Sequence, residues 1–109
     1  MYEDLVALLK AIEGVSFAEY EWKTRPAGNF GTVQPDFEAA DDDGDNAKQE
    51  RAWEGSVDLY THGQEMMLAA AVESAIASVC GPSWKLNSIQ YERETGLVHR
   101  EFVFQLEVM

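Results

Sequence analysis

The chain has 109 residues, of which 46% are apolar, and a formal net charge of -12. This length predicts one domain, residues 1–109, with a single hydrophobic core. The charge argues against non-specific nucleic-acid binding and against anionic membranes, because both kinds of binding depend on lysine and arginine.

The lone cysteine, Cys80, excludes an internal disulfide and a multi-cysteine metal site. No signal segment opens the chain, and no apolar run approaches the roughly 20 residues needed to span a bilayer. The sequence therefore predicts a soluble protein of the cytoplasm.

The first third of the chain predicts one helix and two short strands. VSFAEYEW alternates as a strand does, and RPAGNFG then indicates a loop. FGTVQPDFEAA is a weaker strand, in which Pro35 favours the edge of a sheet because proline cannot donate to a ladder. In EDLVALLKAIEG, the apolar residues with the spacing of one helical face are Leu5, Leu8, Leu9 and Ile12.

The middle of the chain predicts a strand followed by a second helix. RAWEGSVDLYT alternates clearly and should pair with the preceding strand as a hairpin. Thr61 and Gln64 match a capping box, which predicts that the helix begins after Thr61 and ends at Gly81. Its predicted apolar stripe consists of Leu68, Val72, Ala75, Ile76 and Val79.

The remaining segment, WKLNSIQYERETGLVHREFVFQLEV, predicts a hairpin that turns near Thr95 and Gly96. The elements then follow the order α-β-β-β-α-β-β. We predict an α+β fold in which two helices pack on one face of a mainly antiparallel sheet. One face of the last strand should carry Val98, Phe102, Phe104, Leu106 and Val108.

An acidic stretch, EAADDDGDNAKQE at 38–50, lies between the strands of the first hairpin. Alignment with a calcium-binding EF-hand loop fails, because position 1 falls on Ala39 and strands rather than helices flank the stretch. We favour a solvated hairpin tip, while weak divalent-cation binding and an acidic interaction surface stay open as alternatives. The aspartates concerned are Asp41, Asp42, Asp43 and Asp45.

No group of residues predicts catalysis or a cofactor. His62 and His99 lack the spacing of a zinc site, and both are predicted to face solvent. The serines lie in no nucleophile-elbow motif, and Cys80 at a helix C-terminus has the wrong dipole for a reactive thiolate. We therefore expect a protein that is not an enzyme.

Three tryptophans differ in their predicted roles. Trp53 and Trp84 begin or end strands and should cover the rim of the core. Trp22 lies beside Lys23 and Arg25 in the one local basic cluster and is predicted to be an exposed contact residue.

Three stretches carry a family resemblance: DLYT at 58–61, the helix that begins QEMMLAAAVESAI, and YERETGL at 91–97 before an alternating strand from about Val98 to Val108. Their order and spacing resemble the tail-terminator, tail-completion or head-tail joining proteins of long-tailed bacteriophages. The resemblance covers roughly the last seventy residues well and the first thirty by element order alone. The acidic DDDGD departs from the family pattern, and YEWKTRPAGNFG matches no motif of it.

The resemblance implies a structural protein of the virion, present in the host bacterial cytoplasm during assembly. It implies a homo-oligomeric ring, often a hexamer, that caps the tail tube and contacts the tail-tube and head-connector proteins. The acidic residues 41–45 are then expected to face the ring lumen or a neighbouring subunit. The Pro35 edge strand and the Lys23 and Arg25 cluster are the expected opposite sides of the ring seam.

Another class of function fits the charge. An acidic protein can imitate DNA and inhibit a nuclease or a repressor. Against this alternative, the acidic residues outside 38–50 alternate with apolar ones, as ordinary solvent-facing positions do.

Overall fold

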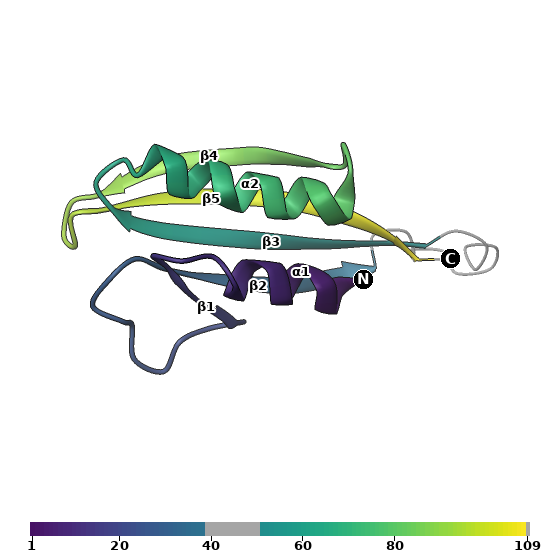
Figure 1. Cartoon of the computed structure of the whole chain (residues 1–109), viewed down its shortest axis with the longest axis horizontal. Helices are drawn as coiled ribbons and strands as arrows, with labels where there is room; N and C mark the ends of the chain where they lie inside the picture. The colour runs from purple at the N-terminus through teal and green to yellow at the C-terminus, as the bar shows by residue number, and fades with distance from the viewer. Residues whose placement is uncertain (39–50, 109) are drawn as a thin grey trace.

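A computed structural model of the chain describes residues 1–38 and 51–108. The order of elements is the predicted one, and the architecture is α+β (Figure 1). The predicted acidic site residues, Asp41, Asp42, Asp43 and Asp45, lie outside the described residues. The elements are α1 (Tyr2–Lys10), β1 (Ser16–Glu19), β2 (Phe30–Glu38), β3 (Arg51–His62), α2 (Met66–Cys80), β4 (Trp84–Glu92) and β5 (Leu97–Val108).

The five strands form one sheet in the order β1-β2-β3-β5-β4. Both predicted hairpins are confirmed, because β2 pairs antiparallel with β3 and β4 pairs antiparallel with β5. The centre of the sheet is the antiparallel ladder between β3 and β5, which runs without interruption from the pair Arg51–Val108 to the pair His62–Leu97. The short strand β1 is parallel to β2, an arrangement that the sequence pattern does not predict.

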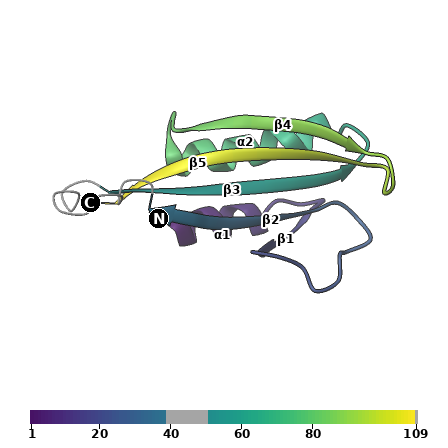
Figure 2. The same cartoon turned by 180° about the vertical axis from the view of Figure 1, so that it is seen from behind.

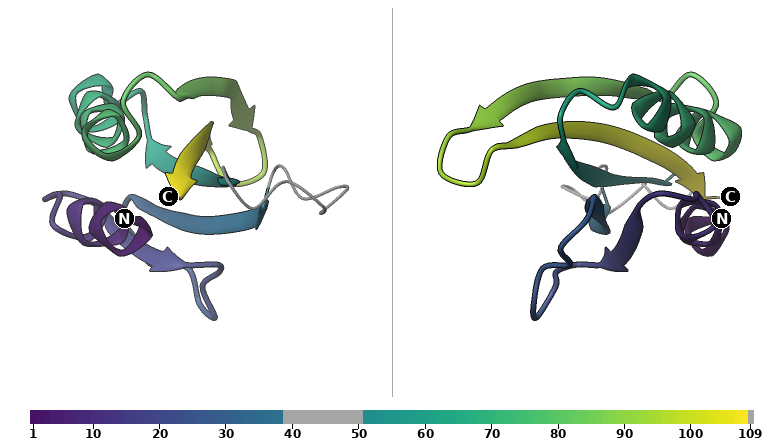
Figure 3. Two further views of the ribbon diagram at one scale, coloured as in Figure 1. Left: turned by 90° about the vertical axis from the view of Figure 1, so that its right-hand side faces the viewer. Right: turned by 60° about the vertical axis from the view of Figure 1, so that its left-hand side comes forward.

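Both helices cover the same face of the sheet. The end-on view of Figure 3 shows α1 and α2 on one side of the strands, and Figure 2 shows the sheet from the uncovered side. Alternation along each strand sends every second side chain toward the helices. The fully buried residues of the core are Leu5, Leu9, Val33, Val57, Leu59, Val72, Ile76 and Phe102.

The buried stripe of α1 differs from the predicted one. Leu5 and Leu9 are buried as expected, but Val6 is buried with them and Leu8 is exposed. The helix also ends at Lys10, before Ile12, which packs at the edge of the core. Because α1 contacts both β1 and α2, its buried face includes Val6 and excludes Leu8. The face predicted from residue spacing alone is therefore wrong at these two positions.

The predicted capping box at the start of α2 is wrong. Thr61 is buried within β3, and its hydroxyl donates to the Gly63 carbonyl at 2.8 Å. The helix begins at Met66, after Glu65 in a left-handed conformation with φ of 49°, and no side chain caps it. The strand extends further than predicted because β5 continues to pair with it as far as His62.

The rest of α2 agrees with the sequence. Four residues of its predicted stripe are buried, Val79 is partly buried against the core, and the helix ends at Gly81. Trp53 and Trp84 are partly buried and pack against the core, as predicted for rim positions.

Pro35 does not lie on the edge strand of the sheet. Strand β2 is internal over Phe30–Val33, where β1 lies on one side and β3 on the other. At Pro35 itself β1 has ended, and the register with β3 shifts between Pro35 and Glu38. The missing proline N–H is therefore tolerated next to a bulge, where β3 alone among the described strands flanks β2, so the predicted edge position holds at Pro35 although β2 is not the outermost strand.

Candidate functional site

The uncovered face of the sheet is the largest surface without helices. Its side chains alternate with those of the core and are mostly polar, in contrast to the apolar face beneath α1 and α2. The polar side chains that β2, β3 and β5 place on this face include Thr32 and Gln34, then Glu54, Ser56 and Asp58, and finally Glu101 and Gln105.

One row across this face is aromatic. Phe30, Tyr60 and His99 are register partners on three neighbouring strands. The rings of Phe30 and Tyr60 stack with centroids 4.8 Å apart, and those of Tyr60 and His99 stack at 4.2 Å. This row is a continuous stack that stabilises the sheet at one end of its uncovered face.

The loop 20–29 folds back over the aromatic row. The Arg25 guanidinium lies 5.2 Å from the Phe30 ring centroid and 4.9 Å from that of Tyr60, which is cation–π geometry. The loop is fixed from its other side by His62, whose backbone N–H donates to Asn29 Oδ1 at 2.8 Å and whose ring Nε2 lies 3.0 Å from the Ala27 carbonyl oxygen.

The predicted basic cluster is therefore divided. Trp22 is half-buried rather than exposed, because its indole N–H donates to the Gly31 carbonyl at 2.9 Å. Arg25 and Lys23 are both exposed, but Arg25 lies over the rings of Phe30 and Tyr60. Between loop and sheet lies a hollow of about 330 Å³ with Glu21 and Asp58 on its walls. Its lining also includes Tyr20, Trp22, Arg25, Phe30, Thr32, Gln34 and Tyr60.

His99 is not the solvent-facing residue that was predicted. It is 20% exposed, and its Nε2 lies 2.7 Å from Asp58 Oδ1, while Glu92 Oε2 lies 4.0 Å from its Nδ1. The neighbouring Tyr60 hydroxyl has a raised pKa, chiefly because of burial and then because of Asp58. The Tyr60 hydroxyl is therefore protonated at neutral pH, and the contact with Asp58 holds the His99 ring in the stacked row.

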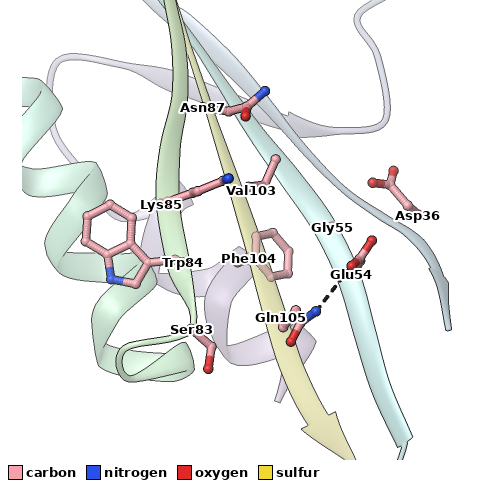
Figure 4. Close-up of a pocket in the computed structure, with 10 residues that line it drawn as sticks. All are labelled: Asp36, Glu54, Gly55, Ser83, Trp84, Lys85, Asn87, Val103, Phe104 and Gln105. Carbon is pink, nitrogen blue, oxygen red and sulfur yellow. Dashed lines mark hydrogen bonds between the residues drawn. The ribbon is translucent and has the colours of Figure 1, made fainter. Parts of the chain in front are cut away.

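A larger hollow of about 550 Å³ lies at the opposite end of the uncovered face (Figure 4). Asp36 and Glu54 lie on neighbouring strands here, and Gln105 Nε2 donates to Glu54 Oε2 at 3.2 Å. Asn87 Nδ2 donates to Glu101 Oε1 at 3.0 Å, which ties the edge of the sheet to its centre. The wall is mixed in charge and built on the four adjacent strands β2, β3, β5 and β4, so its shape is set by the sheet itself.

A buried arginine was missed in the sequence. Arg100 is only 3% exposed and occupies the core-facing position between Val98 and Phe102 on β5. Its Nη2 donates to Gln64 Oε1 at 3.3 Å and contacts Met66 Sδ at 3.6 Å, while its buried Nη1 has no hydrogen-bond partner among the described residues. The alternation of β5 could have predicted this burial, because Val98, Arg100 and Phe102 lie on the same side of the strand whatever the residue type at position 100.

Replacing Arg100 by methionine should raise the free energy of unfolding by about 1 kcal/mol, because burial removes the hydration of the guanidinium and no hydrogen-bond partner among the described residues replaces it at Nη1. Urea denaturation followed by tryptophan fluorescence measures the change. The matched control is Arg93→Met in the exposed β4–β5 turn, expected within about 0.5 kcal/mol of the parent. A clear loss of stability in Arg100→Met alone would show that the guanidinium contributes net stability.

The Cys80 thiol is unreactive, as the sequence analysis predicts. Burial raises the pKa of the Cys80 thiol to about 11, so that it is protonated at neutral pH. Within residues 1–38 and 51–108, no three histidine, cysteine, aspartate or glutamate side chains are arranged to hold a metal ion.

No protein-family model matches the sequence, and no curated protein matches it significantly. Neither of the helices described is both long and apolar enough to cross a bilayer.

Proposed function

We propose that this chain is a structural, non-enzymatic subunit of a long-tailed bacteriophage or prophage that caps the tail tube and helps join the tail to the head. It would act as a homo-oligomeric ring in contact with the tail-tube and head-connector proteins. The observation that supports this most is the uncovered sheet face, with its carboxylates in the central strands and both helices on the opposite side.

The uncovered face suits the wall of a channel through which DNA passes. Asp58 of β3 is the register partner of Glu101 of β5, and Glu54 lies on the same face of β3 opposite Gln105, so carboxylates recur along the centre of the face. Such a wall offers DNA phosphates few cations and releases no counterions, so the DNA slides past it without binding. The net charge of -12 acts in the same direction over the whole subunit.

The structure changes which of the two basic residues, Lys23 or Arg25, is suited to the proposed contact between ring subunits. A ring closes when one patch meets a different patch on the next copy. Lys23 is exposed and available for such a contact, but Arg25 is engaged by Phe30 and Tyr60. We therefore assign the contact role in the loop 20–29 to Lys23, and a role for Arg25 in holding the loop on the sheet.

The experiment that tests the function is deletion of the gene in the phage or prophage that carries it, followed by negative-stain electron microscopy of the particles. Tails that vary in length or exceed the normal length, without attached heads, are expected. Restoration by the parent gene supplied in trans is the control. Normal tails joined to heads after deletion would contradict the proposal.

The DNA-mimic alternative has weaker support on this surface. Carboxylates that imitate a phosphate backbone need an uninterrupted array, whereas Lys85, Arg25 and His99 lie among the acidic residues of the uncovered face. Affinity purification from the host separates the two functions: recovery of a basic nuclease or repressor without any tail protein would favour the mimic.

A further inference from the structure

Strand β4 is a free edge of the sheet. It pairs with β5 along one side, and no strand among the described residues pairs with its other side. An unpaired edge exposes a row of backbone N–H and C=O groups that another strand can join. Natural edges are usually protected by a central charge, a proline or a covering loop. In β4, WKLNSIQYE, the charged residues are confined to Lys85 and Glu92 near the ends, and proline is absent.

The same edge exposes apolar side chains on the helix-covered side of the sheet. Ile89 and Tyr91 are 54% and 66% exposed, and Leu86 is exposed as well. Figure 1 shows that the end of β4 extends past the first turn of α2. Met66 extends the patch, because its sulfur contacts Arg100, the register partner of Ile89. We name Met66, Leu86, Ile89 and Tyr91 the β4 patch.

A bulge in β4 sets which residues share a side. The register with β5 shifts between Leu86 and Ser88, so Asn87 is the additional residue. With Asn87 omitted, the helix side of β4 reads Leu86, Ile89, Tyr91, and the uncovered side reads Lys85, Ser88, Gln90, Glu92.

We propose that two copies of this chain pair through their β4 edges, antiparallel and about a two-fold axis at Ile89. In this register Ile89 faces Ile89 of the second copy, and Leu86 faces Tyr91 of the second copy, so that both β4 patches merge. On the uncovered side Lys85 faces Glu92 of the second copy, and Ser88 faces Gln90. When two β4 strands pair in opposite directions, the charged residues therefore face residues of opposite charge and the apolar residues face apolar ones.

The other edge of the sheet is a poorer partner for β4. Strand β1 has four residues, against nine in β4, and carries a glutamate at its end. A β4–β4 pair instead joins two long strands and covers the apolar residues of both copies, which a contact with β1 would leave largely exposed. The second copy is therefore the occupant that the residues of β4 favour.

This pairing goes beyond the ring of the proposed function. A contact that is the same on both copies closes at two subunits, whereas a ring needs two different patches. The pair is a state of the protein away from the tail, in which the β4 edge is protected from uncontrolled addition of further strands.

Sedimentation-velocity ultracentrifugation of the full chain over a concentration series tests the proposal, and a dimer is expected. Ile89→Lys places two ammonium groups at the axis and should raise the dimer dissociation constant at least about tenfold. The matched control is Met67→Lys: Met67 is 88% exposed but lies on the side of α2 that faces the α1–β1 turn, and the dimer should be unaffected. Circular dichroism verifies that each variant is folded.

A charge exchange tests the register. Lys85→Glu places two carboxylates opposite each other and should weaken the dimer, whereas the double variant Lys85→Glu with Glu92→Lys should restore it. Glu92 also accepts a hydrogen bond from Thr95, so Glu92→Lys alone is measured as well. A monomer at every concentration, or an oligomer of any size that Ile89→Lys leaves intact, would overturn the proposal. Neither result changes the tail phenotype of the gene deletion, which tests the ring separately.

Discussion

Truncation of Phe102 to alanine should lower the free energy of unfolding by about 4 kcal/mol. Phe102 is fully buried at the middle of β5, where its register partners are Val57 on β3 and Leu86 on β4. Its ring centroid lies 6.1 Å from that of Trp84, in a tilted arrangement. Removal of the ring leaves a cavity that strands on both sides prevent from collapsing, so the full cost of about 3–5 kcal/mol for a core phenylalanine is expected.

Urea denaturation followed by far-ultraviolet circular dichroism measures this loss without reliance on the Trp84 environment. Met67→Ala serves as the control, because its side chain is almost fully exposed on α2 and truncation should change stability by less than about 0.5 kcal/mol. A loss below about 1 kcal/mol in Phe102→Ala would mean that this part of the core is loosely packed and can close around the missing ring.

Replacing Gly55 by alanine should cost about 3 kcal/mol. A Cβ atom at Gly55 would lie 2.5 Å from Phe104 Cζ and 2.6 Å from the backbone oxygen of Gln34. Phe104 is buried and is the register partner of Gly55, and the tip of its ring occupies the space that a Cβ would need. The backbone of β2 is held by its own pairing with β3 and cannot move aside without loss of hydrogen bonds.

The matched control is Gly28→Ala in the loop 20–29, where an added Cβ meets no atom within 4 Å and φ is not positive. This substitution should gain about 0.5 kcal/mol, because alanine reduces the entropy of the unfolded chain. Comparison of the two variants by urea denaturation separates the clash at Gly55 from the general effect of glycine replacement. Equal stabilities would contradict the close approach of Phe104.

Elements with a strong local period were predictable from the sequence. The alternation of β3 and β5 and the turn at Thr95 and Gly96 are properties of adjacent residues, and both hairpins have the expected pairing. The stripe of α2 was also found, because a helix that packs on a sheet must present one apolar face.

Features decided by distant contacts were not predictable. Thr61 and Gln64 match a capping box locally, but pairing with β5 keeps Thr61 in a strand, and Gln64 accepts a hydrogen bond from Arg100 instead. The parallel pairing of β1 depends on how the loop 20–29 returns to β2. In each case a tertiary contact outweighs a local preference of about 1 kcal/mol.

The candidate site was found in part. Arg25 and Trp22 do line one hollow of the uncovered face, but the strand residues that complete it come from β2 and β3, whose register alternation alone cannot specify. The stack of Phe30, Tyr60 and His99 follows from the register of β2, β3 and β5, which a single sequence does not specify. The exposure of Lys23 and the burial of Trp22 depend on the same register.

The position of β5 has a consequence for how the chain reaches its native state. This strand comes after all the other described strands along the chain, yet it lies between β3 and β4. The hairpins β2–β3 and β4–β5 each form from neighbouring segments, whereas the ladder of β3 with β5 must close a loop that contains α2 and β4. The entropy of that closure is lost before most core contacts form, so docking of the two hairpins should be the slow step of folding.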